Sequence, residues 1–461
     1  MARQRVHGPR PHAGAAAGID RPLVRRIARS ARRLRRGLSG REQGRLAGTR
    51  RGRTIRRRGQ HRNRRTVLFR RRRAGDRVKR LLLAGGGHSH VFVLDALARA
   101  PLADVEVTLV SPFDRQVYSG MLPGWITGHY AIEQCVIPLA PLAQRANARF
   151  VQAHVARLDL AARVAYTEAS EPLPFDVISI ATGPVMNLDA IPGLREHAIA
   201  LRPIESLIRA WPRLFAQLVA LAEAGEDAGT VTVLGGGAGG VELAFAIAHR
   251  ARIACVPARV QLVTGKPGLL PTLGEGVRRR IARLAPARGV RLIEDDAAEI
   301  TRHTVLLADG GEIASDVTIA AIGAAAADWP REAGLAVDER GFIAVDDRLQ
   351  SISHPFVFAA GDCASIVGHP RPKSGVYAVR AGPPLARNLM RHLAGKRPRR
   401  YRPQRVALYL ISTGPQHAVA SWDGLSTEGR WVWRWKDRID RRFVARYAAH
   451  EPAPATSPAQ G

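Results

Sequence analysis

The sequence predicts an α/β fold built from two similar βαβ units, and three observations support this expectation. An apolar strand, a glycine-rich turn and a helix follow one another at residues 79–99, and the same order begins again at residue 230. Further apolar segments at residues 177–183, 317–323 and 356–361 each run into glycine. Strands that alternate with helices indicate parallel sheets. At 461 residues the chain is long enough for two or three domains with separate cores.

Positive charge is concentrated at the start of the chain. The formal net charge is +32, but residues 1–78 hold 27 arginines and only three acids, whereas the other 383 residues carry a net charge of +8. The segment has too few apolar side chains to offset the entropy of ordering. Two interpretations stand: an arm that binds nucleic acid or acidic lipid through phosphate groups, or translated DNA upstream of a true start near Val78. We favour the second, and expect a nucleic-acid partner only if the native protein contains the arm.

The number and spacing of the cysteines limit the cellular compartment in which the protein is expected. The chain has three, Cys135, Cys255 and Cys363, which are too few and too scattered for a disulfide framework. This usage is typical of a reducing cytoplasm. No run approaches the ~20 apolar residues of a membrane span. We therefore expect a cytoplasmic protein, and we predict no metal site.

The first βαβ unit begins at the apolar run Lys79–Ala84, which we expect to be a strand. A glycine turn follows, then a helix over Val91–Arg99 and a second strand over Val105–Val110. A phosphate-binding loop requires this strand, turn, helix and strand context.

Within this turn, Gly85 permits the tight bend and Gly87 lets the backbone approach a pyrophosphate at the helix N-terminus. His88 is also a predicted cofactor-binding residue. His90 stands where the motif has its third glycine, and Ser111 stands where an acid usually binds the ribose diol. The first loop is therefore a weak motif by itself.

The second unit carries the complete G-x-G-x-x-G motif at Gly235, Gly237 and Gly240, directly after the strand Thr230–Leu234. Two such motifs in βαβ context are strong evidence for two dinucleotide sites. The next predicted strand runs into Thr264-Gly265-Lys266, which offers a lysine but no acid. The choice between NADH and NADPH therefore stays open at this point.

Three later strands are predicted to end near a bound cofactor. The first runs into Thr182-Gly183 and the second into Gly323, where glycine allows close backbone approach. The third runs into Gly361-Asp362, which would place a carboxylate in the ligand crevice of such a fold. The alternative for Asp362 is a helix cap.

In this order the motifs resemble the pyridine nucleotide-disulfide oxidoreductase superfamily, over residues 79 to 447. The resemblance implies that the first loop binds FAD, that the second binds NAD(P)H, and that Gly361-Asp362 binds the FAD ribityl chain. It divides the chain into an FAD domain (79–195 and 315–395), an inserted NAD(P)H domain (196–314) and a C-terminal α+β region with a disordered tail (396–461).

Three segments carry a closer resemblance: Tyr118–Gly124, Pro372–Arg380 and Trp431–Asp440. They are similar to NADH-dehydrogenase-like flavoproteins that often occur fused to selenide, water dikinase. A histidine in the first loop is usual in that group. The resemblance also implies that Tyr118 and Pro123 lie against the isoalloxazine.

The redox chemistry is limited by the absence of a cysteine pair close in sequence, which disulfide reductases need. Direct hydride transfer from NAD(P)H to the flavin is therefore expected, with Lys373 and Glu242 as predicted catalytic residues. Lys373 would add positive charge beside a helix starting near Ser374-Gly375. Glu242 would lie near the nicotinamide by resemblance, or would only complement the helix dipole.

The electron acceptor is predicted from the resemblance to be a quinone, with a sulfide or selenium compound as the alternative substrate. The segment Trp431–Val444 has Trp431, Trp435 and Ile439 at helical spacing among basic residues. This pattern suits a helix lying on the inner face of the cytoplasmic membrane, or one packed on the flavin domain or on a second copy in a homodimer. We favour packing. A non-catalytic flavin-binding or nucleic-acid-associated protein is the alternative from another class.

Overall fold

The computed structural model of the protein describes residues 78–224 and 229–448. Nearly all of the arginine-rich segment predicted as an extension lies outside the described residues, and so do residues 449–461 at the end of the C-terminal region, for which a disordered tail is predicted. All described residues belong to one compact unit, Ala74–Gly461.

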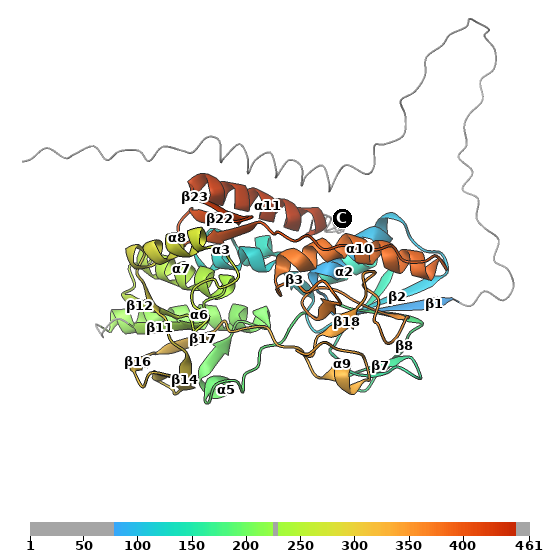
Figure 1. The fold of residues 1–461 in the computed structure, drawn as a ribbon, viewed down its shortest axis with the longest axis horizontal. Coiled ribbons are helices and arrows are strands. Elements are labelled where there is room, and N and C mark those ends of the chain that lie inside the picture. The colour runs from blue at the N-terminus through green and yellow to red at the C-terminus, as the bar shows by residue number, and fades with distance from the viewer. Residues whose placement is uncertain (1–77, 225–228, 449–461) are drawn as a thin grey trace, which may run out of the picture. The chain divides into compact units, whose positions relative to one another are not determined.

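The first sheet has five parallel strands in the order β19-β9-β1-β2-β5. Helices α2 (His88–Arg99) and α10 (Gly375–Leu393) lie side by side on it (Figure 1). In the middle strand Leu81, Leu82 and Leu83 are almost fully buried, as expected for a strand covered on both faces. The strands are β1 (Lys79–Ala84), β2 (Val105–Ser111), β5 (Ala148–Gln152), β9 (Val177–Ile180) and β19 (Val357–Ala359).

The second sheet is also parallel, in the order β10-β17-β11-β12-β13. Its strands are β10 (Ala198–Ala200), β11 (Gly229–Leu234), β12 (Ala258–Val263), β13 (Val290–Ile293) and β17 (Val317–Ala320). Its helices are α6 (Ile204–Glu223), α7 (Ala238–Ile253) and α8 (Glu275–Ala287). The predicted domain boundary at residue 314 is wrong, because β17 pairs with β10 and β11 and so continues the second sheet.

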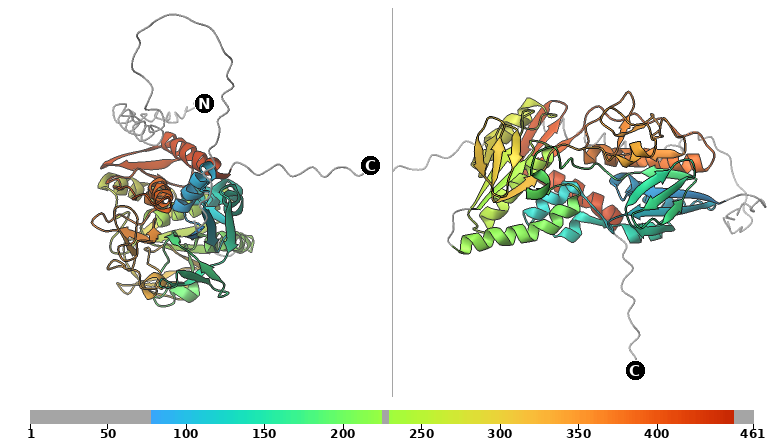
Figure 2. Two further views of the ribbon diagram at one scale, coloured as in Figure 1. Left: turned by 90° about the vertical axis from the view of Figure 1, so that its right-hand side faces the viewer. Right: turned by 90° about the horizontal axis from the view of Figure 1, so that it is seen from below.

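The two sheets repeat one plan, and the right-hand view of Figure 2 shows the early strands of the first sheet (blue to teal) apart from the strands of the second (green to yellow). In each, the strand before a glycine loop lies between the next strand and a late strand, β9 or β17. An antiparallel three-stranded sheet precedes each late strand: β6 (Val155–Asp159), β7 (Val164–Thr167) and β8 (Pro172–Pro174), then β14 (Ala297–Ile300), β15 (Thr304–Leu307) and β16 (Glu312–Ala314). The order reverses at β1 and at β11, and ligands bind beyond the carboxyl ends of strands at such points.

The segment after β2 joins the two cores. Met121 is buried in the core of the first sheet, whereas its neighbour Leu122 is buried in the core of the second. The elements here are β3 (Arg115–Val117), η1 (Ser119–Met121), α3 (Leu122–Ile126), η2 (Ile132–Cys135), β4 (Val136–Pro138) and α4 (Leu139–Arg145). The predicted flavin-facing segment therefore lies at the junction of the two sheets. Short elements elsewhere are α5 (Leu194–His197), α9 (Trp329–Glu332), β18 (Ile343–Val345) and β20 (Ala364–Ile366).

The C-terminal part comprises β21 (Tyr409–Ser412), β22 (Ala418–Trp422), β23 (Leu425–Gly429) and the helix α11 (Arg430–Ala448). The predicted helix and its favoured packing against the rest of the protein are confirmed, but Trp431, Trp435 and Ile439 do not form its fully buried face. Ile439 is 39% exposed, and Trp431 stacks on Trp435 with ring centroids 6.4 Å apart, both half-buried. The buried face lies one residue further along the helix than the aromatic stripe. Two charged residues can lie on it because Lys436 and Asp440 are hydrogen-bonded to each other. The buried residues are Val432, Lys436, Asp440, Val444 and Tyr447.

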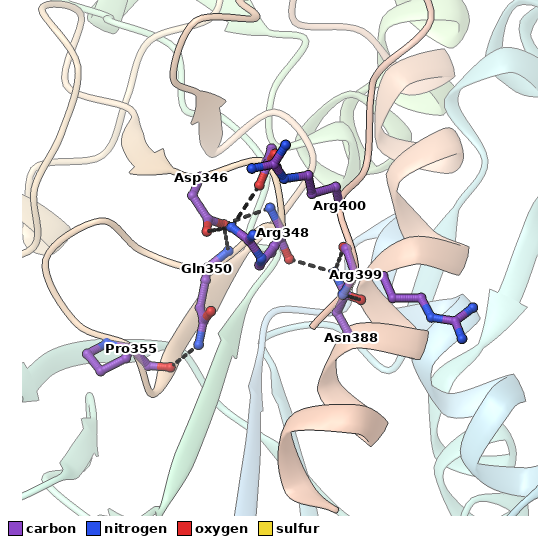
Figure 3. A network of polar contacts seen from close by, with 8 residues as sticks. Asp346, Arg348, Gln350, Pro355, Asn388, Arg399 and Arg400 are labelled. Carbon is purple, nitrogen blue, oxygen red and sulfur yellow. Dashed lines mark hydrogen bonds and ion pairs between the residues drawn. The ribbon is translucent and has the colours of Figure 1, made fainter. Parts of the chain in front are cut away.

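A polar network fixes α10 to the turn before β19 (Figure 3). The amide of Asn388, fully buried in α10, donates to the carbonyl oxygens of Arg348 and Arg399, at 2.8 Å each. Its oxygen accepts from the Arg399 N–H at 2.9 Å. Arg348 in turn pairs with Asp346 at 3.1 Å. A buried amide with every partner made holds a helix firmly in place, and this one fixes the C-terminal half of α10.

Candidate functional site

The first glycine loop is shaped by its close approach to the end of β9. Gly85 adopts a φ of +95°, which favours glycine. A Cβ on Gly87 would lie 2.2 Å from the carbonyl oxygen of Ala181. Gly87 is also the N-cap of α2. Glycine is therefore required here by the protein's own packing.

His90 occupies the third glycine position and is fully buried. Its Nδ1 lies 2.6 Å from the Gly85 carbonyl oxygen and its Nε2 lies 2.9 Å from the Ser179 hydroxyl. A carbonyl only accepts, so Nδ1 carries the proton and Nε2 accepts from Ser179. Burial lowers the pKa of His90 to about 4, against a smaller opposing effect of the Gly85 hydrogen bond. The ring is a neutral brace between the loop and β9, with both nitrogens used by protein atoms.

Two inaccessible polar atoms near the N-termini of α2 and α10 have no hydrogen-bond partner, the Nε2 of His88 and the Oγ of Ser374. Burial, followed by the charge of Arg202, lowers the pKa of His88 to about 4. Orphaned buried polar atoms are rare and costly. Helix N-termini also attract anions. These two atoms therefore mark a place where a polar ligand would supply the missing bonds.

Asp362 lies between these two helix ends, and 8% of it is exposed. Its carboxylate accepts the Ser374 N–H and lies 3.6 Å from the guanidinium of Arg202. Burial raises its pKa, opposed by Arg202 and Lys373. Both predicted roles of Asp362 are therefore compatible: it lies at the end of β19 and meets the N-cap of α10. Sequence reasoning missed Arg202, which precedes α6 in the second sheet's part of the chain.

Lys373 precedes the N-cap of α10, so the predicted helix start at Ser374-Gly375 is confirmed. Its ammonium donates to the Ala364 carbonyl oxygen at 2.6 Å and lies 3.7 Å from the centre of the Phe342 ring. Burial lowers its pKa, partly offset by Cys363 and acids nearby. Its charge is close to Asp362 and held by protein contacts.

The remaining predicted residues of the first site differ in whether contacts within the protein leave them open to a ligand. Gly183 has a φ of +76° with open space around it, next to the exposed Thr182. The Ser111 hydroxyl donates to the Phe113 carbonyl oxygen at 2.9 Å and closes a turn. Pro123 is buried in the first turn of α3. Open backbone thus lies at the end of β9, whereas the Ser111 hydroxyl is engaged at the end of β2.

The second glycine loop has the same backbone with more open space. Gly235 has a φ of +120°, and a Cβ on Gly240 would lie 2.0 Å from the Gly235 carbonyl oxygen. Gly237, the N-cap of α7, has nothing within 4 Å of an added Cβ, and neither does Gly323. Space left empty at an N-cap glycine is what a pyrophosphate needs.

A buried group of charges lies at the junction of the sheets. Lys436 and Asp440 of α11 are 7% and 5% exposed and their charged atoms are 2.6 Å apart. Lys436 also donates to the Gly120 carbonyl oxygen, and Tyr118 is hydrogen-bonded to Asp440. Burial would lower the pKa of Lys436, but Asp440 and Glu242 outweigh it and raise the pKa. The ammonium is therefore held charged beside two carboxyl groups.

Glu242 reaches this group from α7. Its Oε1 accepts the Ser412 N–H at 2.8 Å, and burial raises its pKa against the effects of Lys436 and Ser412. The helix-dipole alternative for Glu242 is wrong, because α7 begins at Ala238 and its first turn holds no acid. The sequence signal that could have revealed this group is the single lysine of α11, placed four residues before Asp440 among arginines.

Two of the three cysteines, Cys135 and Cys363, are buried and act as donors, whereas Cys255 is exposed. The Cys363 thiol donates to the Ala360 carbonyl oxygen at 3.4 Å, and the Cys135 thiol to that of Ala131 at 3.5 Å. Burial raises both pKa values, for Cys135 to about 12. Reactive cysteines need the opposite, a depressed pKa. Within residues 78–224 and 229–448, no three His, Cys, Asp or Glu side chains are grouped as a metal site requires.

Comparison with known proteins gives a consistent picture. Residues 79–382 match the family model for pyridine nucleotide-disulphide oxidoreductases. The chain is 28% identical over 240 residues to an NADH dehydrogenase-like protein of Mycobacterium tuberculosis, covering 51% of this chain and 60% of that one. It is 24% identical over 339 residues to the type II NADH:quinone oxidoreductase of Staphylococcus aureus, covering 69% and 83%. The match therefore spans less than two thirds of the mycobacterial relative.

Solved structures share the fold. NDH2 from Plasmodium falciparum, in complex with NADH, has a TM-score of 0.70 at 14% identity, covering 80% of this chain and 97% of that one. The sulfide:quinone oxidoreductase of Aquifex aeolicus has a TM-score of 0.67 at 18% identity, covering 82% and 93%. None of the helices in the described part of the chain is both long enough and apolar enough to span a bilayer.

Proposed function

Since the chain belongs to the pyridine nucleotide-disulphide oxidoreductase family, we propose that it is an FAD-dependent NAD(P)H oxidoreductase that passes electrons to a quinone. One observation carries the proposal. Two glycine loops lie at the carboxyl ends of two parallel sheets, and the helices α2 and α7 start directly on them. This duplicated arrangement supports two dinucleotides in one protein. The names of the relatives favour NADH dehydrogenation and a quinone acceptor.

The residues at the first loop fit FAD. The unpartnered Nε2 of His88 and Oγ of Ser374 need polar partners, and the N-terminus of α2 suits a pyrophosphate. Asp362 suits the hydroxyls of the ribityl chain, and the N-terminus of α10 with Lys373 suits negative charge on the flavin. When bound, FAD supplies the hydride acceptor and the electron relay.

The second loop fits the nicotinamide dinucleotide. Gly237 leaves room for a pyrophosphate at the N-terminus of α7. Gly323 lies in open space beyond β17. Both face the part of the fold where β11 ends.

The chain's own role in quinone reduction is to hold protons. Glu242 and Asp440 place two carboxyl groups beside one ammonium, that of Lys436. Two carboxylates around one cation in a buried place favour retention of a proton on one of them. Tyr118, bonded to Asp440, continues the group toward the first loop, where its ring is 5.6 Å from that of His88. We assign the protons of the quinol to this group.

Peripheral membrane association is part of the proposal. The half-buried Trp431 and Trp435 and the exposed Ile439 follow one another along α11 at four-residue spacing, with arginines around them. Aromatic rings and arginines on one helix suit the headgroup region of an acidic bilayer. A quinone acceptor would be taken from there. A homodimer remains the alternative use of this face.

The test is an anaerobic titration of the purified flavoprotein. NADH or NADPH should bleach the flavin absorbance, and a short-chain quinone added next should restore it. Flavin that stays oxidised with both nucleotides would refute the proposal. If the nucleotide reduces the flavin but the quinone does not reoxidise it, the proposed NAD(P)H dehydrogenase activity stands and the proposed quinone acceptor is refuted.

The proposed function and the sulfide alternative differ in whether a cysteine thiol takes part in the reaction. The chemistry of the sulfide alternative would need a reactive thiol, whereas Cys135 and Cys363 are buried donors. Cys135→Ser and Cys363→Ser should therefore leave flavin reduction by the nucleotide within about twofold of the parent. The nucleic-acid alternative rests on residues 1–78, and N-terminal sequencing of the native protein decides whether they are present.

A further inference from the structure

The ends of β12 and β13 emerge side by side in the second sheet. The strands pair in parallel with Val263 opposite Ile293. The Thr264 N–H then donates to the Ile293 carbonyl oxygen at 2.9 Å, and the Gly265 N–H to that of Asp295 at 3.0 Å. In this fold class the end of the second strand after the glycine loop meets the adenosine ribose. Residues that follow β13 therefore share that place.

Asp296 brings a carboxylate to the end of β12, where the sequence of that strand supplies none. Its Oδ1 accepts the Lys266 N–H at 2.8 Å, and its Oδ2 lies 3.8 Å from the Lys266 ammonium. A Cβ on Gly265 would lie 2.9 Å from the same Oδ1. The carboxylate is thus built against the backbone at this position.

A second carboxylate, that of Asp295, lies beside it and accepts the Asp296 N–H at 2.8 Å. Asp295 accepts the Asp309 N–H at 3.0 Å, which pins the β15–β16 turn next to β13. Asp309 itself accepts the Gly311 N–H at 2.8 Å. Asp295 and Asp296 therefore lie beside one cation, Lys266, whereas the carboxylate of Asp309 is used within its own turn. The local charge is negative although the strand end reads as a lysine.

We propose that Asp296 acts in place of the missing strand-end acid and makes the site select NADH over NADPH. The inference rests on the proposed function and deepens it. A carboxylate binds the 2′-hydroxyl of NADH, whereas the 2′-phosphate of NADPH would bring about two negative charges next to the carboxylates of Asp295 and Asp296. Like charges at this range are unfavourable even when screened by solvent.

Lys266 does not reverse this preference. Its side chain is 76% exposed and its ion pair with Asp296 is long, so it contributes little binding energy. NADPH enzymes typically use arginine here, which pairs with phosphate through two parallel hydrogen bonds. Lysine cannot do this.

The test measures binding of the unreactive NAD+ and NADP+ to the FAD-loaded protein by calorimetry, with stopped-flow reduction by NADH and NADPH as a second readout. The parent should bind NAD+ about tenfold or more tightly than NADP+. Asp296→Asn keeps the acceptor for the Lys266 N–H and removes the charge. This substitution should reduce the ratio of NAD+ affinity to NADP+ affinity at least threefold, mainly through tighter NADP+ binding. Glu171→Gln, which removes a surface acid from the turn before β8, should leave the ratio unchanged.

Equal or tighter binding of NADP+ by the parent would overturn the inference, and so would an unchanged ratio in Asp296→Asn. Lys266→Gln gives a second check, because it should lower NADP+ binding less than threefold. A larger loss of NADP+ affinity would show that Lys266 binds the 2′-phosphate, and it would overturn the proposed selection of NADH. If neither dinucleotide binds, the proposed function itself fails, and this result is distinct from binding with the wrong preference.

Discussion

The two glycine loops have nearly the same backbone but reach it by different means. Gly87 and Gly237 are both N-caps, with φ, ψ of −65°, 162° and −70°, 172°. In the second loop the chain closes on itself, with a Cβ on Gly240 only 2.0 Å from the Gly235 carbonyl oxygen. In the first loop the side chain of His90 reaches the corresponding carbonyl oxygen, that of Gly85. A departure from the motif is therefore replaced by a hydrogen bond.

The difference shows that a glycine motif combines two separate requirements. Glycine is needed at one position because the protein's own backbone is close, and at another because a ligand must come close. Gly87 is confined by Ala181, whereas Gly237 has open space around it. Equivalent positions in the two loops should therefore respond differently to the same substitution.

The largest effect is expected from Gly87→Ala compared with Gly237→Ala. The first places a Cβ 2.2 Å from a backbone oxygen, so the loop must shift, and we expect a loss of about 4 kcal/mol in the free energy of unfolding. The second leaves stability within about 0.5 kcal/mol but weakens NAD+ binding about tenfold. Denaturant unfolding and calorimetry measure the two effects. Equal losses of stability would contradict the comparison.

Removing the brace comes next. His90→Ala leaves the Gly85 carbonyl and the Ser179 hydroxyl without their partner and opens a cavity, for a loss of about 3 kcal/mol. His90→Gly restores the motif and should be no more stable than His90→Ala. His154→Ala, at an exposed histidine, serves as the control. Recovery of stability in His90→Gly would show that α2 can pack as close to the Gly85 carbonyl oxygen as α7 packs to that of Gly235.

Acid should weaken the first loop and spare the second, which contains no titratable side chain between Gly235 and Gly240. The pKa of His90 is about 4 when folded and near its ordinary value when unfolded, so the unfolded chain binds the extra proton between these values. Its contribution is complete above about pH 6.5 and is lost as the pH falls, by about 2 kcal/mol at pH 5. Release of FAD on acidification should precede loss of helix content in circular dichroism. A shift of the transition to lower pH in His90→Gln would support the assignment, and an unchanged midpoint would refute it.

The smallest effect concerns the helices after the loops. Seven residues after each first glycine stand Phe92 in α2 and Glu242 in α7. Phe92 packs against Tyr447, whereas Glu242 belongs to the proposed proton-holding group. Glu242→Gln should slow reoxidation of reduced flavin by quinone about tenfold, or about 1.4 kcal/mol, with unchanged reduction by NADH. Glu339→Gln is the control, at an exposed acid. Slower reduction in Glu242→Gln would assign Glu242 to the nicotinamide instead.

Most of the central strands were predictable because their signals are local. The strand Lys79–Ala84 and the start of α10 at Gly375 follow from apolar runs and glycine positions. The domain boundary at residue 314 was misplaced because strand pairing depends on distant partners, and β17 has no sequence feature that names its sheet.

The site was less predictable for the same reason. Arg202, Asp296 and Lys436 owe their roles to elements that meet only in three dimensions. For α11 the aromatic stripe was the stronger sequence signal, yet the pair Lys436–Asp440 faces inward. Charged residues are rarely buried unless paired, so periodicity alone favours the wrong face.

The position of α11 has a consequence for how the protein is made. Lys436 binds a carbonyl oxygen 316 residues earlier in the chain, and Arg446 pairs with Asp95, 351 residues away. A ribosome must release the chain as far as residue 446 before both contacts can form. Contacts so distant in sequence close slowly. The first loop and α2 therefore remain without α11 while more than 300 further residues are synthesised, and a chain cut short after β23 would lack these contacts.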